Sequence, residues 1–165
     1  MSHQKWILLA EDNLNDADLA VRALSARQNG EVVVIAHDGV EAMDCLHHRG
    51  DFQSRAGPGN PALVLLDLKM PRMGGLEVLR QIKHDARFRG IPVVTFTSSR
   101  EEADVVQSYQ LGANAYVVKP SGFDELVSVL NHIKTFWLHV NEPAPEEGPK
   151  GSKAALPHRA RRTLH

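Results

Sequence analysis

The fold of this chain is decided by the stretch Pro61-Ala-Leu-Val-Leu-Leu-Asp67, an apolar run that stops at one carboxylate and is followed by Leu68-Lys-Met-Pro-Arg-Met-Gly-Gly75. A run without polar alternation is typical of a strand covered on both faces, in the middle of a parallel sheet. Asp67 then lies at the carboxyl end of the strand, the edge where ligands bind in open α/β sheets. An aspartate there can also simply cap the next helix or begin a turn, so Asp67 alone leaves both interpretations open.

Other short apolar runs are predicted to be strands: Trp6–Ala10, Val32–Ala36, Ile91–Thr97 and Ala115–Lys119. Apolar residues at helical spacing follow each strand, and Ser99 with Glu102 forms a capping box that predicts the start of the fourth helix. Five strand-helix pairs with right-handed crossovers predict an α/β fold, a doubly wound parallel sheet with helices on both faces. We expect the flavodoxin-like strand order 2-1-3-4-5, with a longer loop over residues 49–60.

Length and composition predict one domain with an appendage, because 165 residues of which 42% are hydrophobic suffice for one packed core. We place a domain at residues 1–140 and a Pro-rich, basic tail at 141–165, which we expect to be flexible. The tail carries 5 basic and 3 acidic residues, whereas the first 140 residues carry 14 and 17. About 25 residues are too few to build a second domain.

The charge and the cysteine content exclude several classes of protein. A net charge of −1 does not call for nucleic acid or an anionic membrane, and the single Cys45 cannot form an internal disulfide. The first residues lack the apolar core of a signal peptide, and no apolar run approaches the length of a membrane span. We therefore expect a cytoplasmic protein with neither a membrane nor a nucleic-acid partner.

Polar residues follow the predicted strands at the same edge of the sheet, namely Glu11-Asp12, Asp67, Thr97-Ser98 and Lys119-Pro120. Three carboxylates that converge in one pocket repel each other and have raised pKa values unless a cation joins them. Hard oxygen ligands in a partly hydrated site suit Mg²⁺, for which Mn²⁺ can substitute. The pattern predicts a divalent metal site at this edge.

A metal and an amine next to Asp67 would allow its carboxylate to attack phosphorus and form an aspartyl phosphate. Lys119 would hold one phosphoryl oxygen and the Thr97 hydroxyl another, while the small Ser98 leaves space. The alternatives are a β-branched strand residue for Thr97 and a solvated surface amine for Lys119.

Residues 5–135 resemble a response-regulator receiver domain, the module that single-domain chemotaxis regulators also use. The matching motifs agree in order and spacing: Glu11-Asp12, Leu65-Leu-Asp-Leu-Lys-Met-Pro-Arg-Met-Gly-Gly75, Thr97-Ser98 and Gly112-Ala-Asn-Ala-Tyr-Val-Val-Lys-Pro120. Each motif alone is weak evidence. Their joint occurrence makes the resemblance specific.

The resemblance implies that Asp67 accepts a phosphoryl group from a phosphohistidine of a sensor kinase and later loses it to water. It also implies that Asp12, Asp67 and the backbone carbonyl of Lys69 ligate Mg²⁺ or Mn²⁺, with Glu11 bound through water. Glu11 stands where many relatives have aspartate. The protein would be a phosphoacceptor with self-catalysed transfer and dephosphorylation, and not an enzyme acting on other substrates.

Further roles follow from the resemblance. Thr97 and Tyr116 would form a switch, in which the hydroxyl moves toward the phosphoryl group and the ring fills the vacated space; a half-buried strand aromatic is the alternative for Tyr116. Gly75 would permit a close approach of the backbone. The peptide before Pro120 resembles one that is cis in this family, which would aim the amine of Lys119 into the pocket.

Output would occur through a surface, formed by the fourth helix, the fifth strand and the last helix. On the last helix, Leu126, Leu130, Ile133 and Trp137 are predicted to face the core. Val129, Phe136 and Leu138, together with Trp137, are predicted to form a dimer or partner surface. The ending Phe136–Pro145 resembles the extended C-terminus of small regulators that pair with bacterial phytochromes and tend to be homodimers, so we expect a phytochrome sensor kinase as partner.

Other classes fit less well. A phosphohydrolase of the haloacid dehalogenase type has its nucleophile after the first strand in an Asp-x-Asp pattern, whereas Asp67 follows the third and Lys69 replaces the second acid. A flavodoxin needs a phosphate loop after strand one, which is missing. The alternative that we keep is a receiver-like interaction or dimerisation module that works without phosphorylation.

Overall fold

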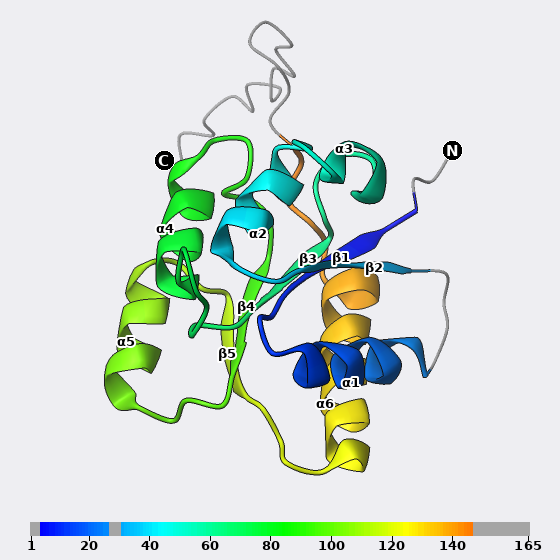
Figure 1. The fold of residues 1–165 in the computed structure, drawn as a ribbon, viewed down its shortest axis with the longest axis vertical. Coiled ribbons are helices and arrows are strands. Elements are labelled where there is room, and N and C mark those ends of the chain that lie inside the picture. The colour runs from blue at the N-terminus through cyan, green and yellow to red at the C-terminus, as the bar shows by residue number, and fades with distance from the viewer. Residues whose placement is uncertain (1–3, 27–30, 147–165) are drawn as a thin grey trace, which may run out of the picture.

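The computed structural model describes residues 4–26 and 31–146, which form a five-stranded parallel sheet (Figure 1). The strands are β1 (Trp6–Ala10), β2 (Val32–Ala36), β3 (Leu63–Leu66), β4 (Val93–Thr97) and β5 (Ala115–Val118). Their order in the sheet is β2-β1-β3-β4-β5. The predicted fold class and strand order are confirmed.

Helices cover both faces of the sheet: α1 (Leu14–Ser25), α2 (Gly39–Leu46), α3 (Phe52–Arg55), α4 (Gly75–His84), α5 (Glu102–Gln110), α6 (Phe123–Thr135) and the π-helical turn η1 (Phe136–Val140). Helices α1 and α6 pack together on one face, while α2 and α4 lie on the other with α5 beside β5 (Figure 1). The short α3 occupies the segment that was predicted to be a loop.

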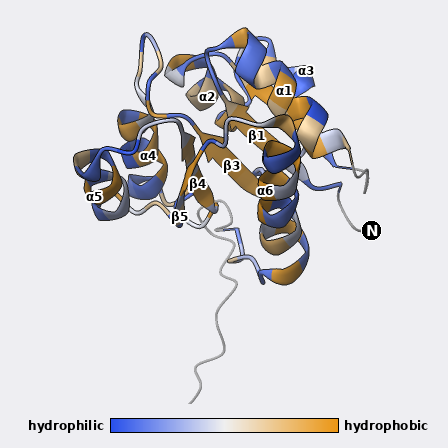
Figure 2. Cartoon of the chain, turned by 90° about the horizontal axis from the view of Figure 1, so that it is seen from below, coloured by the Kyte–Doolittle hydropathy of each residue, from blue (hydrophilic) through white to orange (hydrophobic). Residues whose placement is uncertain are grey.

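The sheet divides the core in two, because successive strand side chains point to opposite faces. Trp6, Leu8 and Ala10 of β1 pack under α2 and α4, whereas Ile7 and Leu9 pack under α1 and α6. Figure 2 shows the hydrophobic strands enclosed by helices with hydrophilic outer faces. Burial on both faces explains why the β3 sequence has no polar alternation.

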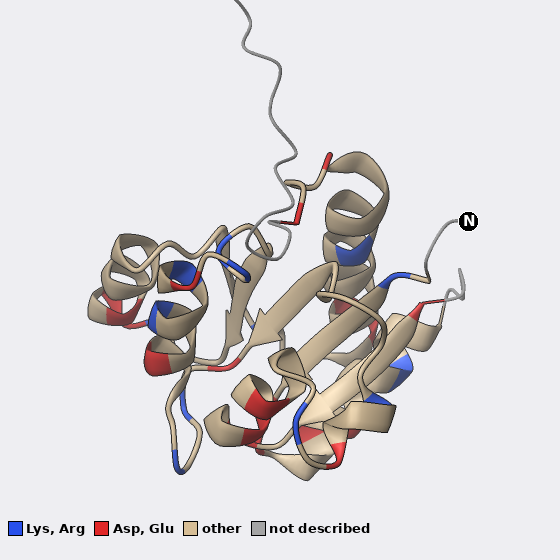
Figure 3. Ribbon diagram, turned by 90° about the horizontal axis from the view of Figure 1, so that it is seen from above, with Lys and Arg blue, Asp and Glu red and all other residues tan. Residues whose placement is uncertain are grey.

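The carboxyl ends of the parallel strands all lie at one edge of the sheet. The register pairs Ala10 with Leu66, so Glu11 and Asp67 leave β1 and β3 side by side. The strands themselves carry no charged residue, and the coloured residues of Figure 3 lie on helices and loops. A Cβ on Gly75 would lie 2.1 Å from the carbonyl oxygen of Asp67, so glycine allows α4 to begin against the end of β3.

The start of α5 differs from the prediction. Its N-cap residue is Glu101, which makes no side-chain capping bond, and Ser99 does not cap the helix. The Ser99 hydroxyl instead donates to Asp104 Oδ2 at 2.5 Å. Ser99 lies in the loop before the helix, two residues too early for the predicted capping box.

The turn η1 corrects the prediction for the end of the last helix. A π-helical turn holds more residues than an α-helical one, so side chains beyond Thr135 rotate away from the stripe extrapolated from α6. Leu138 is therefore 1% exposed and belongs to the core, whereas Trp137 is only half-buried. Phe136 is 47% exposed. Leu138 is not part of any surface, and that prediction is wrong.

Residues 141–146 lie at the amino-terminal edge of the sheet, opposite the edge at which Glu11 and Asp67 follow their strands. Glu146 Oε1 accepts from the backbone N–H of Asn60 at 3.1 Å, and the segment lines a groove of about 570 Å³ together with the loops before β3 and β4. The remainder of the predicted tail, 147–165, falls outside the described residues. Among the described helices, none has the length and apolar character needed to cross a bilayer.

Candidate functional site

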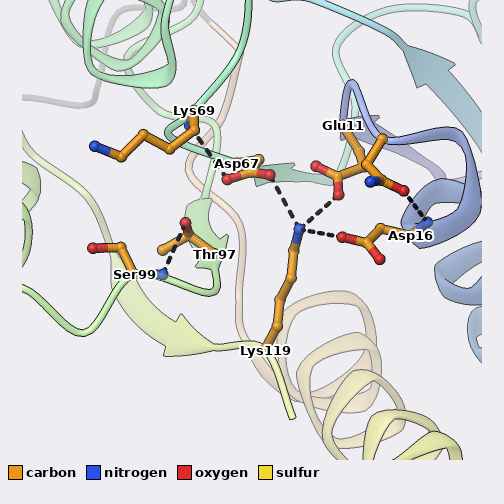
Figure 4. Close-up of polar contacts among 8 residues, drawn as sticks. Glu11, Asp16, Asp67, Lys69, Thr97, Ser99 and Lys119 are labelled. Carbon is orange, nitrogen blue, oxygen red and sulfur yellow. Dashed lines mark hydrogen bonds and ion pairs between the residues drawn. The ribbon is translucent and has the colours of Figure 1, made fainter. Parts of the chain in front are cut away.

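The ammonium group of Lys119 joins three carboxylates at the carboxyl edge of the sheet (Figure 4). Its Nζ lies 2.6 Å from Glu11 Oε1, 3.1 Å from Asp67 Oδ2 and 3.3 Å from Asp16 Oδ2. Lys119 directly follows β5, so its side chain crosses the end of β4 to reach the ends of β1 and β3. The predicted convergence of Glu11, Asp67 and Lys119 is confirmed, and Lys119 is not a solvated surface amine.

Glu11, Asp12 and Asp67 form a cluster in which one oxygen from each residue lies within 4.8 Å of the others. Glu11 and Asp67 are buried, whereas Asp12 is exposed. The Oε2 atom of Glu11 is buried without a hydrogen-bond partner. Such an atom costs free energy unless another ligand satisfies it. An oxygen-only set with one exposed member, open to water on one side, suits a small hard cation such as Mg²⁺.

Electrostatics within the cluster separate the two buried acids. Burial raises the pKa of Glu11 to about 9, and the neighbouring Asp67 adds to this rise while Lys119 opposes it. For Asp67, burial raises the pKa, but contact with the Glu11 carboxyl group and the charge of Lys119 outweigh burial, so the pKa of Asp67 is lowered. Near neutral pH and without a cation, Glu11 is therefore protonated and Asp67 ionised.

Asp67 is the acid with the properties of a nucleophile. It is ionised, is 8% exposed and lies at the end of the central strand. Its Oδ1 faces the backbone N–H of Lys69 at 3.4 Å. An ionised carboxylate beside a fixed ammonium can accept an electrophilic phosphoryl group, because the ammonium offsets the charge that the incoming group brings.

Thr97 is the last residue of β4, and Ser98 follows it. Thr97 is 1% exposed, and its Oγ1 accepts from the backbone N–H of Ser99 at 3.4 Å. Ser98 is exposed, consistent with the open space predicted beside it. Tyr116 is half-buried on β5, and its hydroxyl donates to the carbonyl oxygen of Ser99 at 2.9 Å.

The peptide between Lys119 and Pro120 is trans, since no described peptide bond is cis. The expectation of a cis peptide is therefore wrong for this structure. The X-Pro bond favours trans by roughly 0.5–1 kcal/mol in the absence of opposing contacts. With the trans peptide, the Lys119 amine already contacts Glu11 and Asp67.

An ion pair links the loop after Asp67 to the loop between β2 and α2. Arg72 adopts a left-handed conformation with φ of 63°, and its Nε donates to Asp38 Oδ2 at 2.7 Å. Asp38 also caps α2 through the N–H of Glu41. Burial raises the pKa of Asp38, but the Arg72 guanidinium outweighs it and lowers that pKa. The ion pair thus holds the loop that carries Lys69, whose carbonyl as a metal ligand stays a prediction.

Sequence reasoning missed Asp16 and Asp104. Asp16 lies in the first turn of α1, where Asn13 accepts from its N–H, and its carboxylate touches Lys119. Asp104 lies in the first turn of α5 and contacts Ser99. Acids in first turns also stabilise helix dipoles, so the sequence alone offers no signal that separates these two from ordinary helix starts.

Comparison with known proteins agrees with this geometry. Response regulator Rcp1 of Synechocystis sp. is 37% identical over 134 residues, which cover 81% of this chain and 89% of Rcp1. The crystal structure of Mn²⁺-bound Rcp1 matches with a TM-score of 0.76 at 35% identity, over 86% of this chain and 99% of that chain.

Two further solved structures are similar. The phosphorylated cyanobacterial phytochrome response regulator RcpA matches with a TM-score of 0.79 and 36% identity, covering 86% of this chain and 99% of that chain. The bacteriophytochrome response regulator RtBRR matches with a TM-score of 0.68 and 48% identity, covering 86% and 85%. Residues 7–131 also match the response regulator receiver domain. The chain therefore belongs to the response regulator receiver domain family.

Proposed function

We propose that this protein is the receiver of a two-component phosphorelay, in which Asp67 accepts a phosphoryl group from a phosphohistidine of a sensor kinase. The observation that carries the proposal is the contact of one ammonium, from Lys119, with both Asp67 and Glu11 beside the exposed Asp12. This arrangement provides an ionised nucleophile, a fixed positive charge and room for a cation. A receiver-like interaction or dimerisation module that works without phosphorylation would not need this arrangement.

In the proposed reaction, an Asp67 oxygen forms the new P–O bond while the P–N bond to the kinase histidine breaks and its electron pair returns to the imidazole. Lys119 holds one phosphoryl oxygen through its ammonium, and the Thr97 hydroxyl donates to another. Water later attacks the phosphorus and releases phosphate and the free carboxylate. The protein is thus a phosphoacceptor.

Divalent metal would be held by Asp12, Asp67 and the Lys69 carbonyl, with Glu11 acting through water. Bound there, Mg²⁺ or Mn²⁺ supplies positive charge that neutralises the phosphoryl oxygens. The buried, unpartnered Oε2 of Glu11 and the three clustered carboxylates support this assignment. Before the cation binds, Glu11 can stay protonated while Asp67 is ionised, so the two carboxyl groups do not both carry a charge.

Mass spectrometry of the intact protein tests the proposal directly. Incubation with acetyl phosphate and Mg²⁺ should add one phosphoryl group, and Asp67→Asn should abolish the addition. Asp18→Asn is a matched control, because Asp18 pairs with Arg22 on the exposed face of α1 and should leave labelling intact. Equal labelling of wild type and Asp67→Asn would place the acceptor elsewhere and refute this assignment.

We further propose that the kinase is a phytochrome. The support is the likeness to RcpA and RtBRR, whose names link those proteins to phytochromes. Purified, radiolabelled bacteriophytochrome kinases should transfer phosphate to the wild type within seconds and to Asp67→Asn not at all. A faster transfer from unrelated sensor kinases under the same conditions would contradict the pairing.

The output that we propose is a protein interaction surface, which includes a homodimer contact. Val106 and Tyr109 on α5 are 45% and 51% exposed, all of β5 is half-buried, and Phe136 is exposed next to Trp137. Val129 and Trp137 are half-buried against the core, so they contribute only an edge to this surface. Light scattering over a concentration series should give the mass of a dimer.

A further inference from the structure

The ammonium group of Lys119 contacts as many carboxylates as it has N–H donors. A lysine ammonium has three donors. Its Nζ lies 2.6 Å from Glu11 Oε1, 3.1 Å from Asp67 Oδ2 and 3.3 Å from Asp16 Oδ2, and Figure 4 shows the three acids arranged around it. A phosphoryl oxygen that binds this ammonium must therefore take a donor from one of the three carboxylates.

The surroundings of the ammonium offer few other acceptors. The Lys119 side chain is only 13% exposed. A cavity of about 10 Å³ lies beside it, lined by the same three acids and by apolar residues that include Leu9, Leu65 and Phe96. This volume is at the lower limit for one water molecule. The ammonium thus depends on the carboxylates for its hydrogen bonds.

Asp16 makes the weakest of the three contacts. Its distance to Nζ is the longest, and its side chain is 44% exposed, whereas those of Glu11 and Asp67 are 3% and 10% exposed. A buried carboxylate that loses its partner stays without compensation, but an exposed one can be hydrated instead. Exchange of the Asp16 contact therefore costs the least free energy.

Helix α1 holds the Asp16 carboxylate in place beside the ammonium. Asp16 lies in the first turn of α1, where Asn13 Oδ1 accepts from its backbone N–H at 2.9 Å. Ala20 is one helical turn further along the same face and is 3% exposed, so this face of α1 is directed toward the sheet. Asp16 consequently remains near Lys119 whether or not the two groups are bonded.

We propose that Asp16 is a positioning residue that occupies the third donor of Lys119 and yields this donor to a phosphoryl oxygen on Asp67. This inference rests on the proposed function, in which Lys119 binds the phosphoryl group. Asp16 then competes with the phosphoryl group for one ammonium. Its negative charge also opposes the arrival of another anion, and the two effects have the same sign.

Asp16→Asn should therefore bind a phosphoryl mimic more tightly than the wild type. The amide keeps an oxygen acceptor of similar size but carries no charge, so the ammonium releases it more readily. We expect a gain in affinity of about threefold, which is the scale of one partly exposed ion pair. The variant should fold, because the substituted side chain is partly exposed and Lys119 retains its contacts with Glu11 and Asp67.

Beryllium fluoride is the phosphoryl mimic for this test. Fluorine NMR gives separate signals for free and bound fluoride species, so a titration yields the dissociation constant directly. Mg²⁺ should be kept above saturation for both proteins, so that differences in metal binding do not enter. A beryllium fluoride affinity of Asp16→Asn that is equal to or lower than that of the wild type would overturn the inference.

The affinity for Mg²⁺ alone distinguishes competition from a general rearrangement of the acidic cluster. Loss of a negative charge near the cluster should weaken the binding of a cation, and calorimetry should show a decrease of about threefold. A gain in beryllium fluoride affinity without a gain in Mg²⁺ affinity supports the role of Asp16. A gain in both affinities would show that the substitution has rearranged the cluster, and would also overturn the inference.

Two further variants serve as controls. Asp18→Asn removes the same charge from the same helix, but Asp18 is exposed and pairs with Arg22, so its affinities should match those of the wild type. Asp16→Glu retains the charge and should also behave like the wild type. If either control gains as much beryllium fluoride affinity as Asp16→Asn, the Asp16 carboxylate does not compete for Lys119 and the inference is wrong.

Failure of the proposed function and failure of this inference give different results. A wild type that neither is labelled by acetyl phosphate nor binds beryllium fluoride would remove the proposed function. A wild type that does both, together with an Asp16→Asn variant of unchanged beryllium fluoride affinity, would remove only the role of Asp16.

Discussion

The Nζ atom of Lys119 lies within hydrogen-bond distance, 2.6 Å, of Glu11 Oε1 across the sheet edge, although 108 residues separate the two in the chain. Their side chains are 13% and 3% exposed. Burial lowers the pKa of Lys119, but contacts with Glu11 and Asp67 outweigh this and raise it, so the amine stays charged. One ammonium faces three carboxyl groups, those of Glu11, Asp16 and Asp67. The site therefore retains an excess of acid, which determines how it responds to pH and to cations.

Glu11→Gln should stabilise the metal-free protein at alkaline pH. The pKa of Glu11 is raised from 4.5 to about 9 in the folded state, chiefly by burial. Its contribution to stability is therefore complete below pH 4.5 and is lost as pH rises toward 9. Urea unfolding at about pH 8 in EDTA should show Glu11→Gln more stable than wild type by about 1–2 kcal/mol, and the gap should close at about pH 5.

Glu102→Gln serves as the comparison, because Glu102 is an exposed acid in the first turn of α5. It should alter stability by less than about 0.5 kcal/mol at either pH. A Glu11→Gln variant that is less stable than wild type at alkaline pH would show that Glu11 is ionised in the metal-free fold.

Cation binding should release a proton from the cluster. Carboxylates must be deprotonated to bind a metal, and Glu11 is protonated near neutral pH for the reason just given. Apparent Mg²⁺ affinity should thus rise with pH and level off near pH 9. Calorimetric titrations in two buffers with different ionisation enthalpies should reveal close to one proton released per Mg²⁺. Glu11→Gln should release none, and equal release from both proteins would assign the proton to another group.

Gly75→Ala should damage both stability and phosphorylation. A Cβ at this position would lie 2.1 Å from the Asp67 carbonyl oxygen, which belongs to the backbone and cannot rotate away. The start of α4 would have to move, at a cost of about 1–3 kcal/mol, and the movement would displace Asp67. Gly74→Ala is the control, since its Cβ would meet the Leu68 carbonyl at an ordinary 3.5 Å. Thermal melts and acetyl phosphate labelling of both variants test this, and equal behaviour would contradict it.

The sheet and the position of the Asp67 carboxylate could be predicted because they depend on one-dimensional patterns. The unbroken apolar run before Asp67 requires burial on both faces, and parallel strands must bring Glu11 and Lys119 to the same edge. Asp104 could not be predicted, because its contact depends on how α5 is oriented over the loop at Ser99. No sequence period encodes that orientation.

The end of the last helix shows a second limit. Extrapolation at an α-helical period turned Trp137 toward the core and Leu138 outward, yet Leu138 is buried and Trp137 half-buried. A single change in hydrogen bonding, with the N–H of Asn141 donating to the Phe136 carbonyl, rotates the final turn. Such a change depends on packing beneath the turn, and local propensity does not reveal it.

Substitutions in η1 should separate folding from self-association. Leu138→Ala removes a fully buried side chain and should cost about 2–5 kcal/mol of unfolding free energy. Phe136→Ala should cost less than about 1 kcal/mol, because Phe136 is half-exposed and loses mainly its edge contact with Trp137.

If the proposed dimer uses this turn, Phe136→Ala should weaken dimerisation at least about tenfold while the protomer remains folded. Leu14→Ala, which truncates an exposed apolar side chain at the start of α1, should leave the dimer intact. Urea unfolding measures the stability changes and sedimentation velocity measures the dimerisation of the three variants, and a Phe136→Ala protein that dimerises like Leu14→Ala would remove η1 from the interface.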